Sequence, residues 1–146
     1  MRIRGVKHLK RLARRIRSRF VNGALILGYH RVVDTAQDPY GISVSRENFA
    51  EQLEVLAHQA TLMPLADLVL ALQDHDLPPR AVAITFDDGY ADNLYNAKPL
   101  LARYQAPATV FVATGHLGRE FWWDELESIL LSPAALPEQL RILIDG

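Results

Sequence analysis

Residues 81–90 read Ala-Val-Ala-Ile-Thr-Phe-Asp-Asp-Gly-Tyr, in which six apolar or β-branched residues are followed at once by two carboxylates and a glycine. A short continuous apolar run of this kind is typical of a strand buried on both faces, as in a parallel sheet. The abrupt change at Asp87 predicts that the strand ends at Phe86. Gly89 allows the chain to turn sharply just beyond that end.

Strand and helix patterns alternate on both sides of this strand. Residues 24–29 and 109–112 are similar apolar runs and are predicted as two further strands, whereas 34–45 is predicted as a loop. Ser45 as an N-cap, Pro64 in a first turn and apolar spacings of three and four predict the helices. The predicted helices cover about residues 46–57, 64–73, 93–104, 121–131 and 136–144. The alternation indicates an α/β fold in which helices cover a parallel sheet.

The composition describes one ordinary globular domain. The 146 residues are 49% hydrophobic and 23% charged, which excludes a disordered or collagen-like chain. There is no cysteine, so a disulfide framework, thiolate metal ligands and thiol nucleophiles are excluded as well. Any nucleophile or metal ligand must therefore be oxygen or nitrogen.

The net charge of -1 conceals two segments of opposite charge. Residues 1–20 hold nine of the sixteen basic residues and no acid, so the remaining chain has seven bases against seventeen acids, a net charge of -10. Apolar residues recur at helical spacing among these arginines, which predicts a basic amphipathic helix over 1–22. The apolar stripe consists of Ile3, Val6, Leu9, Leu12, Ile16 and Phe20.

Three interpretations of the basic helix stay open. In the first, the apolar stripe of the helix docks on the domain. In the second, the helix makes peripheral contact with an anionic membrane surface, and in the third its arginines bind nucleic acid. No aromatic platform lies between the arginines and the remaining chain is acidic, so no nucleic acid is expected. The segment lacks the apolar run of a signal peptide, and no stretch approaches ~18 apolar residues. The expected location is cytoplasmic, and association with a membrane through residues 1–20 is the alternative.

Asp87 and Asp88 are the candidate functional residues. Ligands of parallel α/β folds bind beyond the carboxyl ends of the strands, where this pair is expected to lie. Two adjacent carboxylates repel each other, which favours a bound cation or a raised pKa on one of them. Both carboxylates would have a role if one binds a metal ion and the other acts as a base toward a metal-bound water. The alternative is that the pair belongs to a solvated turn without such a role. The spacing fits neither a calcium loop nor a phosphate loop.

The stretch Thr85-Phe86-Asp87-Asp88-Gly89-Tyr90 resembles the first signature motif of the polysaccharide deacetylase family, carbohydrate esterase family 4. Residues 26–32 resemble the first strand and Tyr-His element of these proteins, and 45–70 the helix that follows it. Residues 107–112 resemble the strand after the acidic motif. The Phe-Trp-Trp-Asp stretch over 121–124 is similar to one found in a bacterial subgroup. Residues 23–146 are thus identified as the N-terminal part of a deacetylase-like catalytic domain.

The resemblance implies a distorted (β/α) barrel, here incomplete, and a metal-dependent hydrolase that removes N- or O-linked acetyl groups from a polysaccharide substrate. It implies that Asp87 is the general base and that Asp88 is a ligand of a divalent metal, expected to be zinc. In the family, two histidines separated by three residues complete the metal site, and a later histidine protonates the leaving amine.

The histidines of this chain depart from the family pattern. They are His8, His30, His58, His75 and His116, and no two of them have the required spacing. We therefore expect the N-terminal part of a longer deacetylase that is inactive by itself. The alternative is a non-catalytic fragment or binding module that is attached to a membrane surface or a partner through its basic helix.

Three further residues have weaker expectations. His30 is expected to be a structural residue at a strand end, near enough to the site to be considered. Trp122 and Trp123 suit either sugar stacking or a core, and helical spacing predicts that at least one of them is core.

Overall fold

The computed structural model describes residues 23–131. The helices expected over 1–22 and 136–144 lie outside the described residues. The chain divides into two compact units, the first ending at Val112 and the second beginning at Ala113. Each unit is described by itself below.

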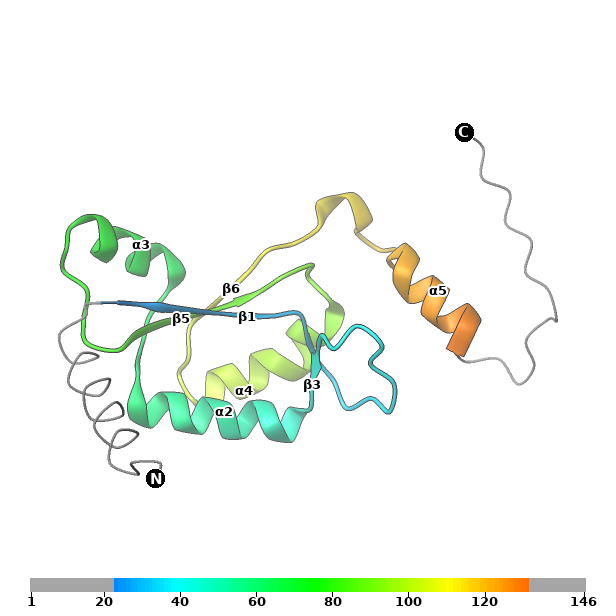
Figure 1. Ribbon diagram of the computed structural model, residues 1–146, viewed down its shortest axis with the longest axis horizontal. Coiled ribbons are helices and arrows are strands. Elements are labelled where there is room, and N and C mark those ends of the chain that lie inside the picture. The colour runs from blue at the N-terminus through cyan, green and yellow to red at the C-terminus, as the bar shows by residue number, and fades with distance from the viewer. Residues whose placement is uncertain (1–22, 132–146) are drawn as a thin grey trace, which may run out of the picture. The chain divides into compact units, whose positions relative to one another are not determined.

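Strands and helices alternate along the first unit (Figure 1). Its strands are β1 (Leu25–Tyr29), β2 (Arg31–Val32), β3 (Ser43–Val44), β4 (Thr61–Leu62), β5 (Ala81–Phe86) and β6 (Ala108–Val110). Its helices are α2 (Arg46–Gln59), α3 (Leu65–Gln73), the π-helix η1 (Asn93–Ala97) and α4 (Lys98–Arg103). The second unit contains the 3-10 turn η2 (Thr114–His116) and the helix α5 (Trp122–Leu131).

The strand β5 is the centre of a four-stranded parallel sheet. The strand β1 pairs with it over nearly its whole length, from Leu25 opposite Val82 to Tyr29 opposite Phe86. On the other side, β4 pairs with the start of β5 and β6 pairs with its end. All of these pairs are parallel, and β2 and β3 form a separate parallel pair. The predicted α/β class with a parallel sheet is confirmed.

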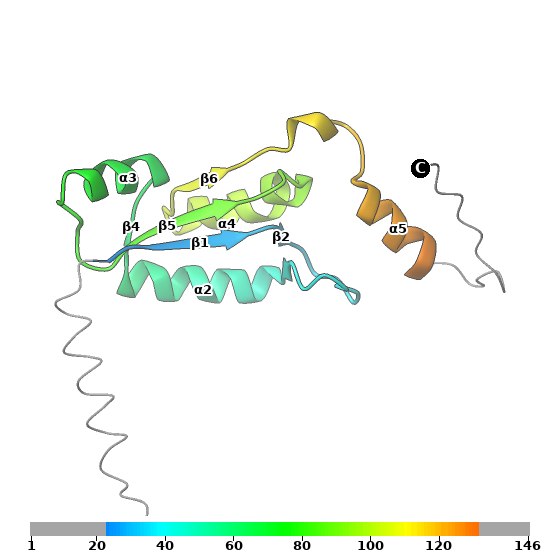
Figure 2. The same cartoon turned by 45° about the horizontal axis from the view of Figure 1, so that its top comes forward.

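The two faces of β5 contact different helices because successive side chains of a strand point to opposite faces. Ala81 and Ala83 pack with Leu68 of α3 on one face. On the other face, Ile84 and Phe86 lie in the larger cluster of buried residues, with helix residues such as Phe49 of α2. The helices α2 and α4 lie side by side along this second face in both views of the ribbon (Figures 1 and 2). Every residue of β5 is consequently buried.

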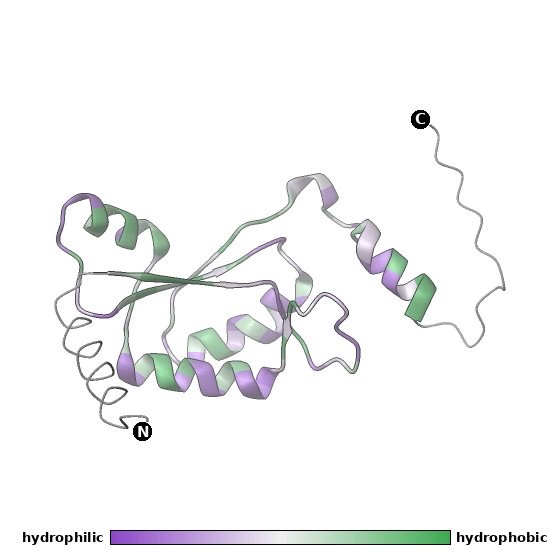
Figure 3. Cartoon of the chain, viewed as in Figure 1, coloured by the Kyte–Doolittle hydropathy of each residue, from purple (hydrophilic) through white to green (hydrophobic). Residues whose placement is uncertain are grey.

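Apolar residues follow this arrangement of layers. Figure 3 shows hydrophobic colour along β5, whereas α2 alternates between hydrophobic and hydrophilic residues along its length. The buried residues of α2 are Phe49 and Leu53, four apart on one face. Its N-terminus has the predicted cap, since Asn48 N donates to the Ser45 hydroxyl at 3.1 Å. The prediction of α2 from capping and periodicity is confirmed.

Two details differ from the sequence prediction. The two-residue strands β2, β3 and β4 were not predicted, because two residues carry no periodic pattern. The helix expected over 93–104 begins as the π-helix η1 before it continues as α4. Pro99 lies in the first turn of α4, a position that tolerates a residue without an N–H donor.

The strands of residues 23–112 form the four-stranded sheet and the β2–β3 pair, so the barrel implied by the family resemblance is not seen in this part of the chain. Among residues 23–131, no helix is long and apolar enough to span a membrane.

Candidate active site

The acidic turn, residues 87–89, begins where β5 ends. Asp87 N donates to Tyr29 O at 2.8 Å, so the pairing between β1 and β5 extends one residue beyond Phe86. Gly89 N then donates to Asp87 O, also at 2.8 Å, which closes a tight turn. Asp88 and Gly89 both have positive φ, at 67° and 78°. Asp tolerates this left-handed conformation better than most residues, and glycine adopts it without strain.

The turn packs against the chain that follows β6. A Cβ atom at Gly89 would lie 3.1 Å from Cγ1 of Val112 and 3.2 Å from its Cα, so a side chain there would require Val112 to shift by a few tenths of an ångström. The prediction that Gly89 permits the sharp turn is confirmed, and the close approach of Val112 is a second reason for glycine.

A rigid aromatic cluster supports the end of β5. The ring of Tyr29 stacks on Phe86 at 5.5 Å and meets the edge of Phe49 at 5.1 Å. The Tyr29 hydroxyl donates to Oε1 of Gln52 at 2.8 Å, and burial raises the pKa of this tyrosine above its ordinary value. The acidic turn is therefore attached to a packed part of the core.

The structure brings His30 to the acidic turn. Nε2 of His30 lies 3.9 Å from Oδ2 of Asp87, and the two side chains are 39% and 47% exposed. The expectation that His30 lies at a strand end near the site is confirmed. Its place follows from strand register: once Tyr29 is paired with Phe86, the next residue of each parallel strand reaches the same edge of the sheet.

A second set of contacts fixes the chain just beyond the turn. Asp92 accepts two hydrogen bonds from β2, from Nε of Arg31 and from the backbone N–H of Val32, both at 3.0 Å. The Arg31 guanidinium also lies over the ring of Tyr90, with Cζ 4.6 Å from the ring centroid. Nδ2 of Asn96 donates to Val32 O at 2.8 Å. These contacts tie β2 to the start of η1 and so hold the chain where it leaves the acidic turn.

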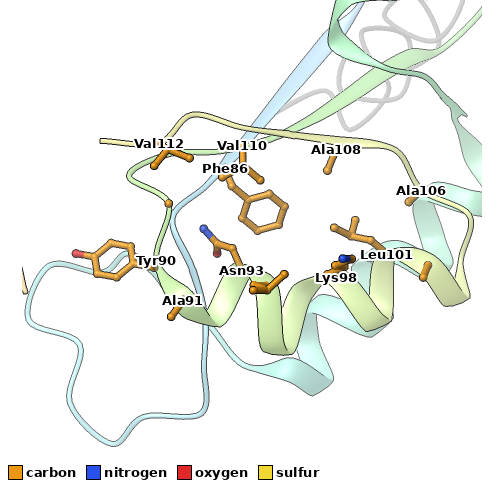
Figure 4. Close-up of a pocket in the computed structure, with 13 residues that line it drawn as sticks. Phe86, Tyr90, Ala91, Asn93, Lys98, Leu101, Ala106, Ala108, Val110 and Val112 are labelled. Carbon is orange, nitrogen blue, oxygen red and sulfur yellow. The ribbon is translucent and has the colours of Figure 1, made fainter. Parts of the chain in front are cut away.

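An apolar pocket of about 570 Å³ lies between η1, α4 and β6. Figure 4 shows that Phe86 and Asn93 point into it, whereas the Tyr90 ring points away. Asn93 is only 6% exposed, and neither polar atom of its side chain has a partner among the described residues. The pocket thus adjoins the turn but offers little polar chemistry of its own.

The second unit separates the two tryptophans. The Trp123 ring stacks on the buried Phe121 with centroids 4.5 Å apart and planes 6° apart. Trp122 meets Trp123 edge-on and is 63% exposed. Trp123 is half-buried, and no residue of α5 is fully buried among the described residues, so the prediction that at least one tryptophan is core is wrong. His116 lies against Phe121 in this same unit, with ring centroids 5.1 Å apart.

The residues present do not make a metal site on their own. Within residues 23–131, no group of three His, Asp or Glu side chains could hold a metal ion. Asp87, Asp88 and His30 stand at the same end of the sheet, but their side chains do not come together as the three protein ligands that a catalytic zinc requires. No reaction step can therefore be assigned to a metal from these residues.

Comparison with known proteins identifies the lineage. The sequence profile described as polysaccharide deacetylase matches residues 74–138, a stretch that includes Asp87 and Asp88. A curated relative, the poly-beta-1,6-N-acetyl-D-glucosamine N-deacetylase of Staphylococcus aureus, is 34% identical over 112 residues, 68% of this chain. This chain belongs to the polysaccharide deacetylase family. A deacetylase of the same name from Staphylococcus epidermidis is 33% identical over 110 residues.

Solved structures agree with this family assignment. Over 73% of the chain, the fold resembles that of IcaB from Ammonifex degensii, with a TM-score of 0.59 and 28% identity. It also resembles a Streptococcus pyogenes deacetylase in complex with acetate over 72% of the chain, with a TM-score of 0.58 and 25% identity. The chain described here spans 39% of the length of the curated S. aureus relative and 47% of the IcaB chain.

Proposed function

We propose that this chain forms part of the active site of a polysaccharide deacetylase, a hydrolase that removes acetyl groups from a polymer of N-acetylglucosamine. The observation that carries the proposal is the acidic pair at the carboxyl end of β5, with His30 3.9 Å from Asp87. The pair lies inside the stretch that matches the family. The names of the curated relatives support N-linked acetyl groups of poly-β-1,6-N-acetylglucosamine as the substrate.

Amide hydrolysis requires that water lose a proton as its oxygen bonds to the acetyl carbon, and that the departing nitrogen gain a proton as the C–N bond breaks. Asp87 is proposed as the base that takes the first proton, since it is ordered by the backbone and half exposed. His30 is proposed as a second proton-transfer group. Its distance from Asp87 exceeds a hydrogen bond, but catalytic contacts often shorten only when the substrate is bound.

Metal dependence is proposed for the whole enzyme and not for this chain alone. Asp88 is proposed as one ligand of a divalent metal such as zinc. The other ligands would have to come from outside residues 23–131, because this part of the chain supplies no third ligand. For the same reason, we propose that residues 1–146 alone have no deacetylase activity.

The test measures acetate release from poly-β-1,6-N-acetylglucosamine by the product of the complete reading frame that contains this sequence, and by residues 1–146 alone. The complete product is expected to release acetate, and the shorter chain is not. Asp87→Asn is expected to lower the rate about 10²–10⁴-fold, as for other general bases. Asp67→Asn, an exposed carboxylate of α3, is the matched control. A wild-type rate for Asp87→Asn would contradict the role of the base, and no release by the complete product would contradict the function.

A second proposed function concerns residues 1–20. We propose that they make peripheral contact with an anionic membrane surface, because nine basic residues and no acid stand in this segment ahead of an acidic remainder. This contact is compatible with a catalytic chain and with a non-catalytic binding module.

A further inference from the structure

The second unit exposes one tryptophan and fixes the other. Trp123 is held by its stack on Phe121, whereas Trp122 stands edge-on to Trp123 and leaves 63% of its surface open. A large exposed aromatic ring beside polar groups is a common feature of binding sites. Trp122 is therefore free to stack on a ligand, and Trp123 is not.

A shallow groove of about 420 Å³ lies beside Trp122. Its lining consists of His116, Arg119, Glu120, Trp122 and Glu125. An aromatic face that takes an apolar ring surface, flanked by charged side chains that take hydrogen bonds, suits a small polar ring such as a sugar. The side chains of Glu120 and Glu125 make no hydrogen bond or ion pair within the described residues, so their carboxylate oxygens are available to a ligand.

The charge around the groove favours a cationic ligand. Residues 113–131 contain Glu120, Asp124, Glu125 and Glu127 against the single Arg119. Acids in the first turn of α5 also stabilise the helix through its dipole, but this role does not account for the exposure of Trp122. Tryptophan is the ring that best attracts a cation placed over its face.

We propose that Trp122, Glu120 and Glu125 bind a glucosamine residue of a partly deacetylated polysaccharide, an inference that rests on the proposed function. Deacetylation converts a neutral acetamide into a primary amine, which is protonated in water. The amine would lie over Trp122 or pair with a carboxylate, and the ring carbons would stack on the indole. The groove would thus hold the polymer through residues that have already lost their acetyl groups.

Fluorescence of the full chain tests this site directly, because Trp122 and Trp123 are the two tryptophans of the whole sequence. Titration with a β-1,6-linked glucosamine oligomer at about pH 6 is expected to change the emission saturably. The same oligomer in its N-acetylated form is expected to bind at least about 10-fold more weakly. The assay needs neither turnover nor metal, so its failure leaves the deacetylase proposal standing, and the failure of acetate release leaves this site standing.

Variants separate this site from a general attraction between opposite charges. Because Trp122→Leu removes half of the reporter, its affinity is measured by calorimetry and is expected to fall about 10-fold or more. Trp123→Phe keeps an aromatic stack on Phe121 and is expected to bind as wild type. The double variant Glu120→Gln, Glu125→Gln is expected to bind weakly and to lose its salt dependence. Glu54→Gln on α2, a charge change in the other unit, is the matched control.

Three results would overturn the proposal. They are equal affinity for the acetylated and deacetylated oligomers, unchanged binding by a folded Trp122→Leu chain, and no saturable signal up to about 10 mM oligomer. If Trp122→Leu does not fold, the test rests on the double variant Glu120→Gln, Glu125→Gln. Binding of the glucosamine oligomer by this variant with wild-type affinity would then overturn the proposal.

Discussion

Gly89 and Gly41 both have positive φ, at 78° and 64°, but their surroundings differ. A Cβ at Gly89 would press on Val112, whereas a Cβ at Gly41 would meet nothing within 4 Å. Gly41→Ala is therefore expected to lower the free energy of unfolding by about 1 kcal/mol, from backbone strain alone. Gly89→Ala is expected to lower it by about 2–3 kcal/mol, since the contact adds to the strain.

Urea denaturation of the two alanine variants checks this difference. Equal losses would show that Val112 moves aside at no cost and that the turn is specified by φ alone. Asp88→Gly completes the set, because glycine adopts the positive φ of this position more easily than aspartate does, and the variant is expected to keep or raise the free energy of unfolding.

The residues of the acidic turn could be predicted from the sequence, whereas the side-chain contacts around it could not. Asp87 and Gly89 follow a strand whose end is marked by a change from apolar to charged residues. His30 is 57 positions away, so only the register of β1 against β5 brings it close. The pair formed by Asp92 and Arg31 depends in the same way on tertiary contact.

Among the elements, η1 contains two asparagines that differ in whether their side chains are hydrogen-bonded. Asn93 is buried and its side chain has no partner among the described residues, whereas Asn96 donates to Val32 O at 2.8 Å. Asn93→Leu is expected to raise the free energy of unfolding by about 1 kcal/mol, since an unsatisfied buried amide is replaced by an apolar group beside an apolar pocket. Asn96→Leu is expected to lower it by about 1–3 kcal/mol, because Val32 is buried and its carbonyl loses its donor.

Chemical denaturation of both leucine variants gives the comparison. A loss for Asn93→Leu as large as that for Asn96→Leu would show that the Asn93 amide is needed in the folded chain.

The start of α2 carries a pH-dependent contact with the preceding loop. The side chain and backbone N–H of Arg46 both donate to Asp34 and lower the pKa of this carboxyl below its ordinary value. A group with a lowered pKa stabilises the fold above its unfolded-state pKa, and this contribution disappears as the pH falls through the folded-state pKa. Arg46→Met is therefore expected to raise the pKa of Asp34 part of the way back, since the backbone donor remains.

Carboxyl NMR titration of Asp34 measures this change, and Arg119→Met in the second unit serves as the control. The stability difference between wild type and Arg46→Met is expected to shrink as the pH drops below the titration of Asp34. A constant difference across that range would assign the effect of Arg46 to packing.

Predictability at the scale of elements depended on length. The helices α2 and α3 and the strands β1 and β5 are long enough for periodicity, caps or continuous apolar runs to mark them. The strands β2, β3 and β4 have two residues each and exist because neighbouring backbone pairs with them. The π-helical start of the helix over 93–103 was equally invisible, because apolar spacing does not separate π from α hydrogen bonding.

At the scale of the whole molecule, the family match and the charge distribution divide the chain differently. The family profile begins at residue 74 and the matched structures cover about three quarters of the chain. The basic residues instead concentrate in the first twenty positions, and the remaining residues have a net charge of -10. A function of residues 1–20 must therefore be tested apart from catalysis.

Binding to lipid vesicles tests whether the basic segment, residues 1–20, contacts an anionic membrane surface. The full chain is expected to bind vesicles of anionic lipid and not vesicles of neutral lipid, because each basic residue near an anionic surface contributes about 1 kcal/mol. Raising the salt from about 0.1 M to about 1 M shortens the screening length to about 3 Å, so binding is expected to be largely lost. Residues 21–146 are expected not to bind, because an acidic protein is repelled by the same surface. Comparable affinity of the full chain for duplex DNA would favour a nucleic-acid arm. A third outcome is that residues 21–146 are much less stable than the full chain and that the full chain does not bind vesicles. This outcome would show that residues 1–20 dock on the rest of the chain.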